Sequence, residues 1–147
     1  MEIWLSPHLG FDFEKSKATI YGSGKNRISY ISVYDVAAFV AKILSNPASR
    51  NGLIELGGAE ALTPLEVVSI FEEVSGRSFQ IQFIPEEALG AQKAAASNPV
   101  EQTFASLRLA AAYGDEIDMY ETLSKFSFRP RSVREYAKFA FNPVSDE

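Results

Sequence analysis

The segment that decides the fold is residues 63–83, TPLEVVSIFEEVSGRSFQIQF, which predicts a helix followed directly by a strand. Its first four residues, 63–66, form a capping-box sequence with proline at the first helical position. Gly76 is typical of the left-handed residue that ends a helix. The alternating residues 79–83 then predict a half-buried strand. Between these signals, apolar residues at helical spacing predict one buried face: Val67, Ile70, Phe71 and Val74.

Upstream of this segment the sequence predicts more β-structure. Two β-prone runs, 18–21 and 27–32, flank the glycine-rich residues 22–26, and the simplest local prediction is a hairpin. Residues 53–56 predict a further strand, which the pair Gly57-Gly58 would close. A glycine pair between a strand and a helix could hold an anion, but a tight exit from the strand is the favoured interpretation.

Helices are predicted on both sides of the deciding segment. An apolar stripe predicts a helix over 36–44, which Ser32 and Asp35 are expected to cap. Three later helices are expected to begin near Pro85, Pro99 and Ser132. The stripe of the first helix contains Val36, Phe39, Val40, Ile43 and Leu44.

Together these elements predict a single α/β domain over residues 1–147, with a small mixed sheet and several helices. No internal repeat or linker divides the chain, and residues 142–147 are expected to be frayed.

Composition narrows the classes of function. The chain has no cysteine and one histidine, His8, so a zinc site of several imidazoles is excluded and we predict no metal. A net charge of -5 opposes nucleic acid or an anionic membrane as the main partner. No apolar run approaches the length of a membrane span and no signal peptide is apparent, so we expect a cytoplasmic protein. His8 is interpreted as a loop residue without a catalytic role. The late basic residues are interpreted as a solvated surface: Lys125, Arg129, Arg131, Arg134 and Lys138.

Several segments in order resemble one family. Residues 24–37, 53–63 and 65–77 are similar to a strand-to-helix segment, the next strand, and the following helix of NmrA-like atypical short-chain dehydrogenases/reductases. Residues 1–4 resemble the segment just after the sixth strand of their Rossmann domain. Residues 128–132 add a weaker similarity.

The resemblance implies the C-terminal, substrate-side half of an NAD(P)-binding Rossmann protein, either an oxidoreductase or a redox sensor. The glycine-rich finger that places a pyrophosphate on a helix N-terminus has no counterpart in this sequence. We therefore expect no cofactor for this chain alone, and NAD(P) only together with a dinucleotide-binding half. Whether the chain is an enzyme by itself stays open.

The resemblance also indicates candidate site residues. It places the N-terminal segment over the nicotinamide and substrate, and the predicted substrate-lining residues are Met1, Trp4, Pro7, Phe11 and Tyr30. No catalytic residue is assigned. Tyr21 and Lys25 match the Tyr-x-x-x-Lys pattern of short-chain dehydrogenases, which needs both residues on one helical turn. Two intervening glycines oppose a helix, so a turn without a catalytic role is predicted.

Two hypotheses follow from the sequence. The first is the substrate-binding portion of an NmrA-like NAD(P)-dependent protein, truncated and inactive alone. The alternative is a stand-alone module that binds a small molecule or another protein. Because the predicted strand at 53–56 would leave one edge unpaired, we also expect a homodimer.

Overall fold

The computed structural model describes residues 1–142, so the expected fraying at 143–147 lies outside the described residues. Helices and short strands both occur along the chain in this range, which confirms the mixed α/β class. The helices are α1 (Val33–Ile43), α2 (Pro64–Ser75), α3 (Glu86–Ala95), α4 (Pro99–Tyr113), α5 (Tyr120–Lys125) and α6 (Val133–Phe141), with short 3-10 helices η1 (Pro7–Leu9) and η2 (Pro47–Ser49). The strands are β1 (Phe11–Asp12), β2 (Lys17–Tyr21), β3 (Ile28–Ser29), β4 (Ala61–Leu62) and β5 (Gln80–Ile84).

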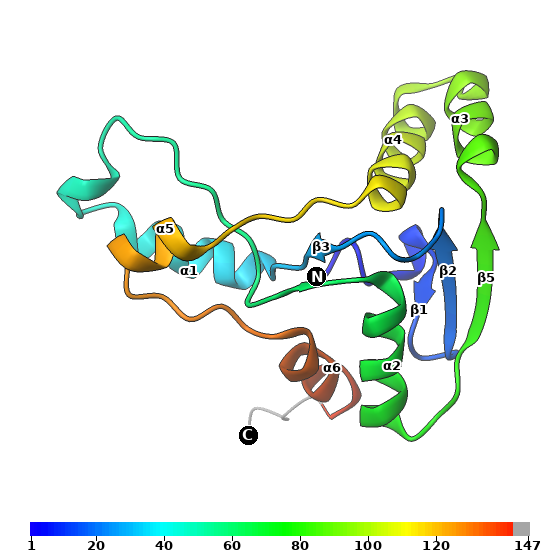
Figure 1. The fold of residues 1–147 in the computed structure, drawn as a ribbon, viewed down its shortest axis with the longest axis horizontal. Coiled ribbons are helices and arrows are strands. Elements are labelled where there is room, and N and C mark those ends of the chain that lie inside the picture. The colour runs from blue at the N-terminus through cyan, green and yellow to red at the C-terminus, as the bar shows by residue number, and fades with distance from the viewer. Residues whose placement is uncertain (143–147) are drawn as a thin grey trace.

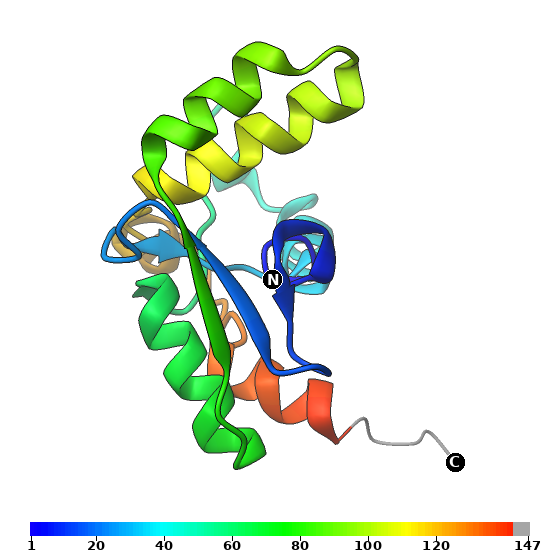
Figure 2. The same ribbon diagram turned by 90° about the vertical axis from the view of Figure 1, so that its right-hand side faces the viewer.

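The main sheet has the strand order β1-β2-β5. Strand β2 pairs antiparallel with β1 and parallel with β5, from Lys17 opposite Gln80 to Tyr21 opposite Ile84. Helix α2 lies along this sheet, and α3 and α4 form a helical hairpin beyond the end of β5 (Figures 1 and 2). A second, two-stranded sheet joins β3 to β4.

The hairpin prediction for 18–21 and 27–32 is therefore wrong. Strand β2 already has a partner on each side, so it offers no edge to the following run. Gly22 and Gly24 have φ values of 68° and 69°, and this left-handed turn directs the chain away to pair with β4 instead.

The core forms where α2 faces the strands. Phe71 has no exposed surface, and its ring meets Phe11 edge-on with a centroid distance of 4.8 Å. Val67 and Val68 on the same helix are 1% exposed. The capping box of Thr63 and Glu66 is present, and Gly76 ends α2 in the left-handed conformation. The prediction for this helix is thus confirmed from its first residue to its last.

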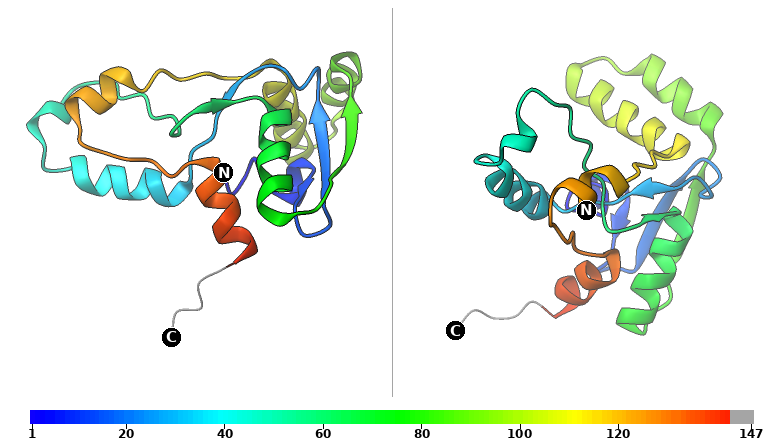
Figure 3. Two further views of the ribbon diagram at one scale, coloured as in Figure 1. Left: turned by 60° about the horizontal axis from the view of Figure 1, so that its bottom comes forward. Right: turned by 60° about the vertical axis from the view of Figure 1, so that its left-hand side comes forward.

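Two segments leave this core and form a projection that we call the arm, residues 32–58 and 115–129; the rest is the body. The arm contains α1, η2 and α5 and extends to one side of the body (Figures 1 and 3). It is held together mainly by Phe39, whose ring meets Phe126 and Phe128 edge-on at centroid distances of 5.6 and 5.0 Å.

Three predictions for the arm and its surroundings need correction. The helix over 36–44 is present, but of its five-residue apolar stripe only Phe39 is buried. Residues 53–56 form no strand, because no neighbouring strand is there to pair with them, and Leu53 is 94% exposed. Strand β5 is close to its expected position, but its residues do not alternate in burial: residues 80–83 are all exposed on an edge strand.

The expected cap of α1 also differs in one residue. Ser32 is the N-cap and accepts a hydrogen bond from the Tyr34 amide. The acidic partner is Glu2 rather than Asp35, since Glu2 accepts from the Val33 amide at 2.9 Å and from the Ser32 hydroxyl at 2.7 Å. Asp35 is left to accept from the Arg131 amide at 2.7 Å.

Candidate functional site: an apolar cavity beside the N-terminal segment

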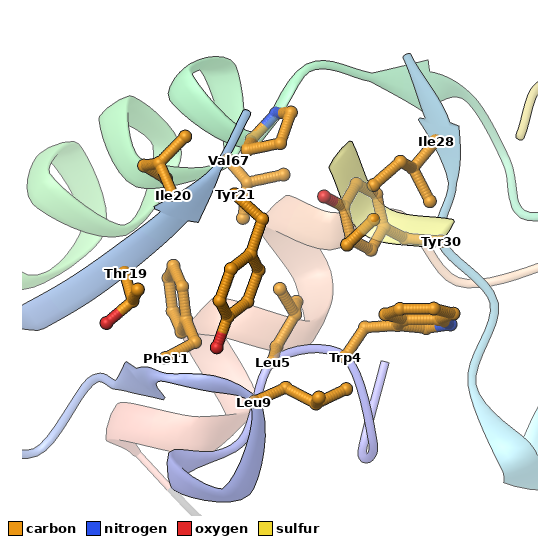
Figure 4. A pocket seen from close by; sticks show the side chains of 12 residues that line it. Trp4, Leu5, Leu9, Phe11, Thr19, Ile20, Tyr21, Ile28, Tyr30 and Val67 are labelled. Atoms are coloured by element: carbon orange, nitrogen blue, oxygen red, sulfur yellow. The ribbon is translucent and has the colours of Figure 1, made fainter. Parts of the chain in front are cut away.

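A small apolar cavity lies between the N-terminal segment, β2 and the start of α2. Its volume is about 40 Å³. Figure 4 shows Leu5 between the side chains of Tyr21 and Trp4, with Tyr30 above Trp4 in this view. The cavity is lined by Trp4, Leu5, Leu9, Phe11, Thr19, Ile20, Tyr21, Ile28, Tyr30, Pro64, Val67 and Ala111.

The N-terminal segment folds into a compact wall because short-range hydrogen bonds fix it. The Leu5 amide donates to the Met1 carbonyl at 2.8 Å, and the Ser6 hydroxyl donates to the Ile3 carbonyl at 2.7 Å. Gly10 then turns the chain into β1 with a φ of 81°. A Cβ at Gly10 would lie 2.6 Å from the Thr19 Cβ, so the wall can sit close to β2 only with glycine at this position.

Three of the five predicted substrate-lining residues, Trp4, Phe11 and Tyr30, do line this cavity. Met1 does not; it is 2% exposed and belongs to the hydrophobic core. Pro7 is the exposed first residue of η1 and does not line the cavity. The role of the five residues in substrate binding stays a prediction.

The polar groups of the cavity are neutral hydroxyls. Burial raises the pKa of Tyr30 far above its ordinary value. Burial also raises the pKa of Tyr21, although the guanidinium of Arg108 beside it opposes the rise. Both phenols therefore keep their protons at neutral pH. The arrangement suits an apolar or aromatic group that accepts a hydrogen bond, and it does not suit an ion.

The size of the cavity limits what it can hold. Pockets for small molecules usually measure roughly 300–1,000 Å³. A cavity of about 40 Å³ accommodates a small substituent rather than a whole substrate. In this structure it is thus one wall of a site rather than a complete site.

Sequence reasoning missed several lining residues, including Tyr21, Val67 and Ala111. They come from β2, α2 and α4, and only the tertiary packing of these elements brings them to the N-terminal segment. For Arg108, which lies beside the lining residue Tyr21, the sequence did contain one signal. Arg108 lies one turn after Phe104 and one turn before Ala111, so it places a charge on an otherwise apolar helix face.

The described residues do not fit a dinucleotide. A pyrophosphate needs free amides at a helix N-terminus after a tight glycine turn. Here the first turns of α2, α4 and α6 are capped by their own side chains, and that of α1 is capped by Ser32 with the Glu2 carboxylate beside it. Helices α3 and α5 lack a side-chain cap, but Glu86 and Glu87 in the first turn of α3 and Glu121 in that of α5 would repel phosphate. We therefore derive no cofactor chemistry from this chain.

The other motifs have structural explanations. Tyr21 ends β2 and Lys25 lies in the following turn, so the two are not on one helix. Gly57 and Gly58 follow no strand, and Gly58 allows a close contact with the carbonyl of Tyr30.

Three of the five late basic residues pair with a carboxylate, which agrees with a solvated surface. The pairs are Arg129 with Glu135 at 2.7 Å, Arg134 with Glu73 at 2.6 Å, and Lys125 with Glu121. No helix within residues 1–142 combines the length and apolar character needed to cross a bilayer.

The described residues thus form an α/β lobe with an apolar N-terminal wall. The profile of the NmrA-like family matches residues 15–137, so the chain belongs to the NmrA-like family.

Curated relatives include reductases and an epimerase. The chain is 31% identical to pinoresinol reductase 1 of Arabidopsis thaliana over 67 residues, which are 45% of this chain and 21% of that protein. It is 29% identical to an uncharacterised UDP-glucose epimerase of Bacillus subtilis over 70 residues, 48% of this chain and 22% of that protein.

Solved structures share the fold across nearly the whole chain. An NADPH-dependent quinone oxidoreductase from Escherichia coli matches with a TM-score of 0.73 and 20% identity, covering 96% of this chain and 52% of that one. A nucleoside-diphosphate-sugar epimerase from Staphylococcus aureus matches with a TM-score of 0.65 and 25% identity, covering 91% and 47%. The chain thus spans about half the length of these structural relatives.

Proposed function

We propose that this chain is the substrate-side half of an NmrA-like NAD(P)-dependent reductase, and that it requires a dinucleotide-binding half to act. The observation that supports this most is the match of 96% of the chain to only 52% of an NADPH-dependent quinone oxidoreductase. In the complete assembly, the wall of Trp4, Phe11 and Tyr30 would enclose an apolar, carbonyl-bearing substrate. The hydride would come from a nucleotide that the other half holds.

The composition of the cavity supports a substrate of this kind. Its side chains are mainly apolar and aromatic, and its hydroxyls belong to Thr19, Tyr21 and Tyr30. Protonated phenols can donate a hydrogen bond to a carbonyl oxygen, which matches the chemistry of a quinone or ketone better than that of a charged sugar nucleotide.

The first test measures cofactor binding by the chain alone. Calorimetric titration with NADPH and NADH is expected to show no binding, because each described helix N-terminus is either capped or carries an acid in its first turn. Binding of either nucleotide in the micromolar range would refute the proposal that only the other half holds the cofactor.

The second test supplies a dinucleotide-binding half. A chimera would join this chain to the portion of the E. coli quinone oxidoreductase that it does not match. We expect NADPH-dependent reduction of a quinone, with a weaker apparent affinity for the quinone after Trp4→Ala. Tyr21→Phe should leave turnover nearly unchanged, because Tyr21 is assigned no role as a general acid and the loss of a general acid costs roughly 100-fold or more. Tyr113→Phe, on the exposed surface of α4, is the matched control. A folded chimera that binds NADPH but responds identically to Trp4→Ala and Tyr113→Phe would favour the stand-alone binding module instead.

A further inference from the structure

A second concave surface lies outside the apolar cavity, between η1 and the α3–α4 hairpin. It measures about 590 Å³, within the roughly 300–1,000 Å³ typical of small-molecule sites. We call it the hairpin groove. It is lined by His8, Gln92, Ala95, Ala96, Val100, Glu101, Phe104, Ala105 and Arg108.

The hairpin groove contains an unusual cation. Within residues 1–142, the Nε of Arg108 is the one buried side-chain nitrogen or oxygen that has no hydrogen-bond partner. None of the ion pairs in that range includes Arg108. A buried donor without an acceptor lowers stability, and one that belongs to a charged group lowers it more. A group that accepts this hydrogen bond and balances the charge would remove that cost.

The charges around Arg108 leave this place open to an anion. Glu101 is the only acid that lines the groove among the described residues, and its carboxylate already accepts from the amide and hydroxyl of Ser97, both at 2.9 Å. The phenol of Tyr21, beside Arg108, keeps its proton because burial raises its pKa. The other polar side chains of the lining, His8 and Gln92, carry no negative charge. A guanidinium binds a planar carboxylate through two parallel hydrogen bonds.

The remaining lining suits an aromatic ring. The rings of His8 and Phe104 lie at a centroid distance of 6.4 Å on one side of the groove. Val100 is 65% exposed, and three alanines leave space beside it. A flat apolar group can therefore lie against Phe104 while its acidic end reaches Arg108.

We propose that the hairpin groove binds a small aromatic carboxylate, with Arg108 as the anion contact and Phe104 and His8 as the ring contacts. This site needs neither the apolar cavity nor a dinucleotide-binding half. Its success or failure is thus independent of the function proposed above.

The test uses the full chain with two probes of the same shape, 4-phenylbutyrate and the neutral 4-phenylbutanamide. Calorimetry measures affinity, and the imidazole NMR signals of His8, the sole histidine, report binding in the groove. We expect the carboxylate to bind roughly tenfold or more tightly than the amide, the scale of one charge-assisted hydrogen bond. Arg108→Gln should abolish this preference, whereas Arg50→Gln in the arm is the matched control and should keep it.

Stability provides an independent measurement. If Arg108 is kept for a ligand, Arg108→Met should unfold at the same or a higher denaturant concentration than the wild type, because the unsatisfied donor is removed. Adding 4-phenylbutyrate should stabilise the wild type and leave Arg108→Met unchanged. Trp4→Phe, in the wall of the apolar cavity, should leave carboxylate binding intact. Equal binding of both probes, no shift at His8, or a strongly destabilised Arg108→Met variant would each overturn the proposal.

Discussion

The body and the arm are built from similar residues but are stabilised very differently. In the body, α2 has a complete capping box, a left-handed glycine terminator, and a face buried against β1 and α6, with Phe71 fully enclosed. In the arm, α1 has an equally apolar stripe, yet only Phe39 is buried, while Val40 and Leu44 are 46% and 79% exposed. The comparison shows that the sequence signals for a helix produce a helix in both regions. Only the body, however, contains a second layer of structure on which its helix can pack.

This comparison also locates the place where another surface belongs. The arm carries residues 32–37 and 53–58, which are parts of the segments that resemble a longer Rossmann protein. The exposed residues of the arm are therefore the best candidates for contact with a dinucleotide-binding half or with a second copy.

Removal of one phenylalanine from each region should give the largest contrast. Phe71→Ala is expected to cost about 3–5 kcal/mol of unfolding free energy, as is usual for a fully buried aromatic side chain. Phe39→Ala should instead abolish protection of the arm amides from hydrogen exchange and leave the unfolding midpoint of the body close to wild type. Equal losses of global stability would mean that the arm and the body unfold as one unit.

Self-association should depend on the arm. We expect light scattering at micromolar concentration to give twice the monomer mass of 16.2 kDa. The double variant Leu44→Glu and Leu53→Glu should restore the monomer, because both side chains are highly exposed. Phe83→Glu on the exposed strand β5 tests whether the sheet edge pairs instead. A single monomeric mass for the wild type would contradict the dimer.

Removal of a helix cap should also destabilise the body more than the arm, but by less than the removal of a phenylalanine. Thr63→Ala removes the N-cap of α2 and should lower stability by about 1 kcal/mol. Asn46→Ala removes the cap of η2 in the arm, where Asn46 accepts from the Ala48 amide at 3.0 Å. Its unfolding midpoint should match the wild type. An unchanged midpoint for Thr63→Ala would show that the capping box contributes nothing to the body.

The smallest expected effect is a change in stability at acidic pH. Glu135 accepts from the Ser132 amide at 2.9 Å and from Arg129 at 2.7 Å, which lowers its pKa from 4.5 to about 2. A carboxylate whose folded pKa is depressed stabilises the fold above pH 4.5, and this contribution disappears as the pH falls toward 2. Glu135→Gln should therefore be less stable than wild type at pH 7 and equal to it near pH 2.

Glu121→Gln provides the matched comparison in the arm. The hydrogen bond from Lys125 lowers the pKa of Glu121 as well, but the residue is exposed on α5. Its substitution should change the denaturation midpoint of the body less than Glu135→Gln does. A pH-independent difference between wild type and Glu135→Gln would contradict the assigned cause.

Sequence reasoning succeeded where the controlling interactions are local. The caps at Thr63 and Ser132 and the turn at Gly76 each depend on residues within a few positions, and all three are present. The hairpin at 18–32 and the strand at 53–56 failed because strand pairing is chosen between distant segments. Glu2 replaced Asp35 at the start of α1 for the same reason, since the Val33 amide that Glu2 accepts from lies 31 residues away in the sequence.

The candidate site shows the same difference between local and long-range contacts. The resemblance of the N-terminal segment predicted Trp4 and Phe11 as substrate-lining residues. Both line the cavity, because that segment folds mostly on itself, and their role in substrate binding stays a prediction. Tyr21 and Arg108 could not be grouped with them, because β2 and α4 meet only in the folded chain.

The close crossing at Gly58 fixes the junction between the arm and the body. A Cβ there would lie 1.9 Å from the carbonyl oxygen of Tyr30, and one at Gly57 would lie 3.0 Å from the Cβ of Ile117. The Ile117 amide also donates to the Ser29 hydroxyl at 3.0 Å. Three segments of the chain are thus held together where the arm joins the body. A methyl group at Gly58 would force these segments apart, so the junction requires glycine at this position.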